Sequence, residues 1–152
     1  MTIEVSISGM DEVERKLKRL GNLRLSKNAA RRAARKAMAL VRDDARTRAK
    51  NIDDPETAEK IWKNITVGAG KTRDVNSIVM RVGVRGGASF SNPNPPNTSG
   101  GDTRHWRWVE LGSVHNPPTP FMRPALQNNI QAVTNSFAEN FNKEIDKELA
   151  KL

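Results

Sequence analysis

The sequence predicts an α+β fold in which a small antiparallel sheet of about three to four strands packs against a long basic amphipathic helix and a C-terminal helix. Three observations support it. Several segments repeat apolar residues at three- and four-residue steps, as one face of a helix does. Other segments alternate apolar and polar residues, as a half-buried strand does. A long polar loop at residues 86–103 separates these elements. With 152 residues and no internal repeat, residues 1–152 are expected to form a single domain.

The first third of the chain is expected to hold one strand and two helices. Residues 2–8 alternate apolar and polar side chains and predict a strand. A helix is expected from about Asp11, and Gly21 is expected to end it. Ser26 is the expected N-cap of a long second helix that reaches about Lys50.

This long helix has two distinct faces at 100° per residue. An arc of small and apolar residues predicts close approach to another element, since small side chains let backbones come near. The arc consists of Ala30, Ala33, Ala34, Ala37, Leu40, Val41 and Ala45. A second arc, the basic stripe, consists of Lys27, Arg31, Arg35, Arg42 and Arg46.

The basic stripe lies in the segment that carries the charge of the whole chain. Residues 11–50 hold fourteen Lys and Arg against five Asp and Glu, which equals the net charge of +9 for the protein. Three interpretations stay open: a solvated helix face, a docking surface for an acidic neighbour, or direct contact with DNA phosphates. Aromatic platforms of the kind that single-strand binders use are missing from this segment.

The remaining elements follow from periodicity and from turn residues. They are a short helix at about Pro55–Asn64, strands at 65–67 and 77–84, a strand or short helix at 105–111, and a last helix from about 120–124 to Leu149. The last helix carries an apolar stripe of Leu126, Ile130, Val133, Phe137 and Phe141, continued by Ile145 and Leu149.

Two patterns that resemble chemical motifs have simpler interpretations. Residues 68–72 (GAGKT) end like a phosphate-binding loop, but position 65 is Ile instead of Gly and a strand follows, which favours a hairpin turn. His105, Glu110 and His115 resemble a metal-ligand set, but spacings of five and five match neither a helical pair nor a compact loop site.

Composition removes several further classes of function. The chain has no cysteine, which excludes disulfides, thiolate metal sites and cysteine nucleophiles. A glycine-flanked serine elbow is also missing. No apolar run approaches the ~20 residues of a membrane span, and the N-terminus lacks the apolar core of a signal peptide. We therefore expect no catalytic, cofactor-binding or metal-binding residue, and no membrane partner.

The densest pattern is a proline-rich stretch that predicts a structural joint before the last helix. Its residues are Trp106, Trp108, Glu110, Gly112, Pro120, Phe121, Arg123 and Pro124. The two tryptophans are expected to bury an apolar wedge. Glu110 has apolar neighbours, so its carboxylate needs partners, for which Arg123 and the amides of the following turn are candidates. Gly112 permits a turn, and Pro124 suits the first turn of a helix.

These residues also resemble a known family. The run W-x-W-V-E-L-G-S at 106–113, followed by P-F-M-R-P-A-L at 120–126, is similar to the signature of the gene-product-ten-like tail-component family of lambdoid, Hong-Kong-type siphophages. The resemblance includes the opening at Ser8–Val13, the long basic helix, and residues 54–67, so it spans most of residues 6–127. Leu111 and Met122 replace commoner choices, and the 86–103 loop is longer than in many relatives.

The resemblance implies a structural virion protein of the head–tail junction, involved in neck formation or tail completion. Such a protein forms a homo-oligomeric ring, with a subunit number that is a multiple of six, and has neither catalytic residues nor a cofactor. Its partners are the connector or head-closure proteins and the tail-terminator or tail-tube proteins, and double-stranded DNA passes through the ring without being read. The alternative from the charge alone is a basic protein that binds double-stranded DNA.

Overall fold

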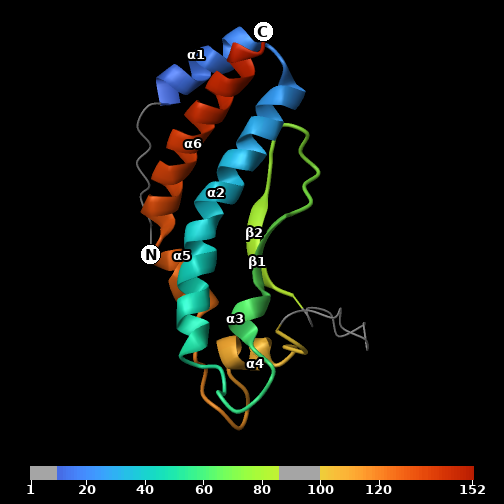
Figure 1. The fold of residues 1–152 in the computed structure, drawn as a ribbon, viewed down its shortest axis with the longest axis vertical. Helices are drawn as coiled ribbons and strands as arrows, with labels where there is room; N and C mark the ends of the chain where they lie inside the picture. The colour runs from blue at the N-terminus through green and yellow to red at the C-terminus, as the bar shows by residue number, and fades with distance from the viewer. Residues whose placement is uncertain (1–9, 86–99) are drawn as a thin grey trace. The chain divides into compact units, whose positions relative to one another are not determined.

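The computed structural model describes residues 10–85 and 100–152 (Figure 1). Its elements, in chain order, are α1 (Met10–Leu20), α2 (Leu23–Lys50), α3 (Ile61–Asn64), β1 (Ile65–Ala69), β2 (Met80–Val84), α4 (Trp106–Leu111), α5 (Met122–Gln127) and α6 (Ile130–Ala150). None of these described helices is both long enough and apolar enough to cross a membrane.

The chain divides into two compact units, and α2 contributes residues to both of them. Among the described residues, the helical unit comprises 10–40, 68–81 and 129–152. The joint unit comprises 41–67, 82–85 and 100–128. The single domain expected over residues 1–152 stays a prediction.

The predicted α+β class is confirmed, with a sheet smaller than expected. β1 and β2 form a two-stranded antiparallel hairpin, closed by the Gly70 amide donating to the Val79 carbonyl at 2.9 Å. The described residues thus hold two strands instead of three to four. The strand expected at residues 2–8 lies outside the described residues, as do residues 86–99 of the predicted loop. Segment 105–111, left open between strand and helix, is the helix α4.

The core of the helical unit lies between α1, α6 and the N-terminal part of α2, which run side by side in Figure 1. Its buried members are Val13, Ala29, Ala30, Ala33, Phe141 and Ile145, with Leu17, Ile78, Phe137 and Leu149 packed around them. The small alanine side chains of α2 leave room for the large side chains of α6, Phe141 and Ile145, in the same cluster.

The small-residue arc predicted on α2 is confirmed with one exception. Ala30, Ala33, Ala34, Ala37, Val41 and Ala45 are all buried. Leu40, placed on the same arc, is 40% exposed. It lies at the border of the arc, where a long side chain extends past the contact instead of into it.

Two predicted helix boundaries are wrong, for local reasons. α2 begins at Leu23 because Asn22 is its cap: the Asn22 Oδ1 accepts the Leu25 amide at 3.1 Å, and Ser26 lies within the first turn. The short helix does not begin at Pro55 but at Ile61. Asp54 stabilises a turn there instead, because its carboxylate accepts the Glu56 amide at 2.9 Å.

The expected last helix is two helices, α5 and α6, with a break at Asn128 and Asn129. Asparagine favours turns because its side chain competes for backbone hydrogen bonds. The Asn128 amide still donates to the Pro124 carbonyl at 3.0 Å, which closes α5. The short α5 therefore belongs to the joint unit, whereas the long α6 belongs to the helical unit.

Candidate functional site

The joint unit is organised around the carboxylate of Glu110, which comes from the last turn of α4 and is 3% exposed. Its Oε2 accepts the backbone amides of Phe121 at 2.7 Å and Met122 at 2.9 Å. Its Oε1 accepts the amide of Arg123 at 2.9 Å. These amides belong to the start of α5, where backbone donors have no partner within the helix. The carboxylate therefore caps α5 from another helix.

The Arg123 side chain completes this arrangement. Its Nε donates to Glu110 Oε1 at 3.2 Å, and its Nη2 donates to the Glu110 backbone oxygen at 2.9 Å. Burial alone would raise the pKa of Glu110, but the three amides and the guanidinium outweigh it and hold the pKa below its usual value. Glu110 is thus an ionised structural group, with the partners that the sequence predicts for it.

Gly112 makes the turn that lets the chain leave α4 and return to Glu110. Its φ is 81°, in the left-handed region, and its amide donates to the Trp108 carbonyl at 2.8 Å. A Cβ on this residue would lie 2.9 Å from the Pro118 nitrogen, so no side chain fits. The Thr119 amide then donates to the Val109 carbonyl at 2.7 Å. This bond holds the segment before α5 against α4.

Phe121 and the two joint prolines occupy different environments. Phe121 is fully buried, as expected of a residue that fixes a helix end. Pro124 lies in the first turn of α5, where the sequence places it, while Pro120 is exposed.

The expected apolar wedge of two tryptophans is wrong in part. Trp108 is 51% exposed, whereas Trp106 is half-buried. The segment is a helix, so residues two apart point to opposite sides and cannot both face the core. The buried indole N–H of Trp106 has no acceptor among residues 10–85 and 100–152. Leu111 and Val114 are also exposed, at 64% and 97%.

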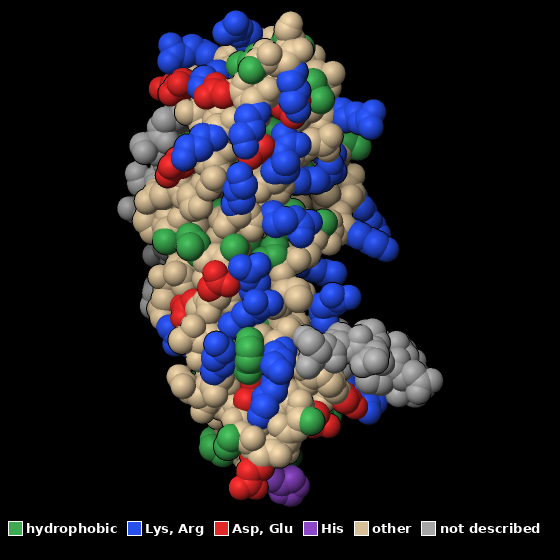
Figure 2. All heavy atoms as spheres, viewed as in Figure 1, with side chains coloured by type: hydrophobic (Ala, Val, Ile, Leu, Met, Phe, Trp, Pro, Cys, Tyr) green, Lys and Arg blue, Asp and Glu red, His purple; other side chains and the backbone are tan. Residues whose placement is uncertain are grey.

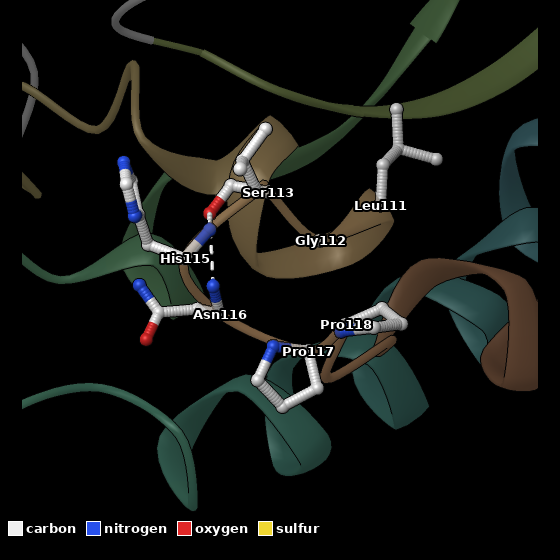
Figure 3. A pocket seen from close by; sticks show the side chains of 8 residues that line it. Leu111, Gly112, Ser113, His115, Asn116, Pro117 and Pro118 are labelled. Atoms are coloured by element: carbon white, nitrogen blue, oxygen red, sulfur yellow. Dashed lines mark hydrogen bonds between the residues drawn. The ribbon is translucent and has the colours of Figure 1, made fainter.

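The loop after α4 encloses a shallow pocket of about 660 Å³. Leu111 and His115 lie at opposite ends of it in Figure 3. The Ser113 hydroxyl oxygen accepts the amides of His115 at 3.3 Å and Asn116 at 3.2 Å, so the polar groups of the loop serve its own turn. With its carboxylate occupied by amides, Glu110 does not join the histidines in a common site.

No cluster of three or more His, Asp or Glu side chains suited to a metal ion occurs in the part of the chain that the structure describes. His105 lines a second pocket of about 360 Å³, between α4 and residue Ile52, whereas His115 lines the first.

Sequence reasoning missed a second polar centre in the joint unit, at Asn64. Its Nδ2 donates to the Thr103 hydroxyl at 2.8 Å and to the Gly101 carbonyl at 3.0 Å, and its Oδ1 accepts the Gly100 amide at 3.0 Å. A Cβ on Gly100 would lie 2.3 Å from the Lys60 carbonyl. The paired glycines at 100 and 101, inside the predicted polar loop, are the signal for this centre, because glycine permits close backbone approach.

The side chains of the basic stripe differ in their contacts, and its role as a partner-facing or DNA-facing surface stays a prediction. Arg46 donates to the Ile65 carbonyl through two nitrogens, at 3.0 and 2.7 Å, and Lys27 donates to the Val75 carbonyl at 2.6 Å. Arg42 pairs with Asp43 at 2.9 Å. Arg31 and Arg35 are exposed. Figure 2 shows Lys and Arg side chains along α2 and over the hairpin.

Sequence reasoning also missed an ion-pair cluster in the helical unit. Glu144 is buried on α6 and pairs with Arg32 at 2.7 Å and Lys36 at 2.9 Å, both from α2. Glu148 pairs with Arg32 at 2.8 Å. These cations lie outside the predicted stripe. Lys36 and Arg32 hold the pKa of Glu144 down, at about 2.

The buried carboxylates of both units, Glu110, Glu144 and Glu148, hold helices in place. The family described as "Bacteriophage HK97-gp10, putative tail-component" matches residues 11–112, and the chain belongs to this family. The protein is therefore a bacteriophage tail component, a structural class, and its place is in the virion. No curated protein and no solved structure matches the chain.

The match ends at Gly112, so it includes Glu110 and excludes the residues that bind it. The contacts from Phe121, Met122 and Arg123 are therefore observations on this chain alone.

Proposed function

We propose that the protein is the subunit of a homo-oligomeric ring at the head–tail junction, which joins the capsid connector to the tail and lets DNA pass. The membership of residues 11–112 in a tail-component family carries this proposal. Its partners are further copies of the chain, the connector or head-closure proteins, and the tail-terminator or tail-tube proteins. The subunit number is a multiple of six.

The joint unit supports the proposal through its surface. Trp108, Leu111 and Val114 are 51%, 64% and 97% exposed on α4 and the loop that follows it. Scattered apolar residues are common on protein surfaces, but three within seven positions of one loop region favour a surface that an assembly partner covers. The Glu110 capping arrangement gives this surface a fixed conformation before any partner binds.

Deletion of the gene from the phage, followed by electron microscopy of the lysate, tests the function. We expect full heads and free tails that do not join, and restored joining when purified protein is added. In intact virions, averaging should show density for a ring of this subunit at the neck. Joined, infectious particles in the absence of the protein would exclude the proposed role.

A further inference from the structure

The hairpin connection between β1 and β2 presents apolar side chains on an exposed surface of the helical unit. Lys27 Nζ donates to the Val75 carbonyl at 2.6 Å and so ties this connection to α2. The Val75 side chain itself is 68% exposed, and that of Val79 is 41% exposed. The two exposed valines lie four positions apart in the chain and offer apolar surface that a partner can cover.

The β1–β2 connection and the part of α2 to which it is tied carry an excess of exposed cations. We call the hairpin face the set formed by Val75, Val79, Arg31, Arg35, Lys71, Arg73 and Arg81. Arg31 and Arg35 follow Lys27 by one and two helical turns, so they lie on the side of α2 to which the hairpin is tied. Figure 2 shows Lys and Arg side chains over both α2 and the hairpin.

The carboxylate of Asp74, within the hairpin connection, offsets only one of the five cations of the hairpin face. Asp74 accepts the Ser77 hydroxyl at 2.6 Å and the Asn76 amide at 2.9 Å. It serves as the cap of its own turn. The hairpin face therefore combines exposed valines with an excess of positive charge.

The joint unit offers the opposite charge in the segment 51–59, which contains Asp53, Asp54, Glu56 and Glu59 and neither Lys nor Arg. Asp53 is engaged, because its oxygens accept the amides of the first two residues of α3 at 3.0 and 3.1 Å. Glu56 and Glu59 are exposed and have no cationic partner within residues 10–85 and 100–152.

The lysines that flank this segment do not neutralise it. Lys50 Nζ lies 4.4 Å from the centre of the Trp62 ring, in a cation–π contact. Lys60 Nζ donates to the Asp54 backbone carbonyl. Two flanking cations against four carboxylates leave residues 50–60 with a net negative charge.

A partly apolar pocket adjoins the acidic segment in the chain. The pocket of about 360 Å³ is lined by Ile52, which immediately precedes the four carboxylates, and by Trp108, Val109 and Pro117. His105, Ser113, Asn116 and Thr119 also line this pocket, so its lining is mixed, and the acidic residues follow it directly in the chain. The hairpin face has exposed valines with basic residues beside them.

We infer that the hairpin face of one copy docks on the joint unit of a second copy, with Val75 entering the Ile52–Trp108 pocket and the cations facing Glu56 and Glu59. The inference rests on the proposed ring and names its subunit contact. It joins two different surfaces of the same chain, and such a head-to-tail contact closes into a ring when the rotation between copies permits.

Duplex DNA is the competing occupant of the hairpin face, since phosphates would also neutralise its cations. Two observations favour the second copy. Phosphate contacts gain nothing from exposed Val75 and Val79, whereas protein interfaces place apolar residues at the centre and charges at the rim. The chain itself also carries a surface of opposite charge with a partly apolar pocket, formed by residues 51–59 and the Ile52–Trp108 pocket.

Charge reversal with native mass spectrometry and sedimentation tests the contact. The two variants are Arg31→Glu/Arg35→Glu and Glu56→Lys/Glu59→Lys. We expect each to need about tenfold more protein than the wild type to assemble, since two rim pairs are replaced by repulsion. The control, Arg15→Glu/Arg19→Glu on α1, makes the same charge change outside the hairpin face and should assemble like the wild type.

An equimolar mixture of the two variants is the decisive sample. It offers one native and one reversed contact per pair of chains, so we expect assembly to return to the wild-type concentration. A mixture that stays dissociated overturns the inference, as does a control that weakens assembly equally. Wild-type assembly that neither variant changes overturns this contact and leaves the ring standing. A wild type that never assembles contradicts both the contact and the self-assembling ring.

A 20-base-pair duplex, titrated with each protein and followed by fluorescence anisotropy, separates the competing occupant. We expect the hairpin-face variant to need about tenfold more protein for assembly in the absence of DNA as well. Loss of duplex binding with unchanged assembly would instead identify the hairpin face as a DNA contact and overturn the inference.

Discussion

Each unit of this protein buries a glutamate, and the two carboxylates are held by different kinds of donors. Glu110 in the joint unit accepts three backbone amides at 2.7–2.9 Å and one guanidinium nitrogen at 3.2 Å. Glu144 in the helical unit has the same exposure, 3%, and its hydrogen-bond partners come from cationic side chains. Those cations, Arg32, Lys36 and Lys147, are 44%, 52% and 61% exposed.

The kind of donor decides what each carboxylate does. The amides that bind Glu110 set the geometry of a helix start, whereas the cations that bind Glu144 add only attraction between helices. Backbone amides at a helix start have fixed directions, so Glu110 determines where α5 begins relative to α4. Exposed Lys and Arg side chains adapt their position and are screened by salt, so Glu144 holds α6 to α2 without fixing an angle. We therefore expect substitutions in the joint unit to cost more than matched ones in the helical unit.

The largest effect is expected from Glu110→Ala. It leaves the amides of Phe121, Met122 and Arg123 without their acceptor at the buried start of α5, so it should lower the free energy of unfolding by about 3–5 kcal/mol. Urea unfolding followed by circular dichroism measures this loss. The matched variant Glu144→Ala should lose clearly less, and equal losses would contradict the distinction between amide-held and cation-held carboxylates.

The next effect is expected from Gly112→Ala. A side chain there meets Pro118 at 2.9 Å and also requires a φ of 81°, so the free energy of unfolding should fall by about 1–3 kcal/mol. Gly68→Ala is the control, because no atom lies within 4 Å of its added Cβ. Thermal unfolding of the two variants side by side checks the prediction. A Gly112→Ala protein as stable as the control would show that the α4–α5 connection is not constrained as described.

A smaller effect is expected from Glu144→Gln, about 1–2 kcal/mol, because water and salt already weaken the attraction of exposed cations. Its distinctive property is salt dependence. In 1 M NaCl the difference between wild type and Glu144→Gln should shrink, since the screening length falls to about 3 Å. The difference between wild type and Glu110→Gln should persist. Parallel urea titrations at low and high salt give both values.

The subtlest effect is a dependence of stability on pH. The pKa of Glu144 is lowered from 4.5 to about 2, so its contribution is complete above pH 4.5 and is lost as the pH falls towards 2. The free energy of unfolding should therefore fall more steeply with acid in the wild type than in Glu144→Gln. Identical slopes between pH 4.5 and 2 would show that this carboxylate is not held by its cations.

Periodicity and residue type predict much of the helical framework. Alanine spacing places the buried face of α2, and Gly21 and Gly112 lie at left-handed positions as their surroundings require. Glu110 is predictable too, since a glutamate among apolar residues needs partners and Arg123 with the next turn can supply them. Such features are local, so the sequence contains their whole explanation.

Contacts between distant segments are the part that could not be predicted. Glu144 lies 108 positions from Lys36, and no spacing rule connects α6 with α2. The use of Lys27 and Arg46 by backbone carbonyls of the hairpin likewise depends on tertiary packing. The predicted start of α2 was wrong because two residues suited to capping a helix, Asn22 and Ser26, lie within a few positions of each other.

Hydrogen exchange of individual amides, followed by NMR in the wild type and in Glu110→Gln, tests most directly the claim that Glu110 fixes the start of α5. The wild type should protect the amides of Phe121, Met122 and Arg123, and Glu110→Gln should reduce their protection about tenfold or more. Glu144→Gln should leave these three amides unchanged. Unprotected amides in the wild type, or equal protection in Glu110→Gln, would contradict the account.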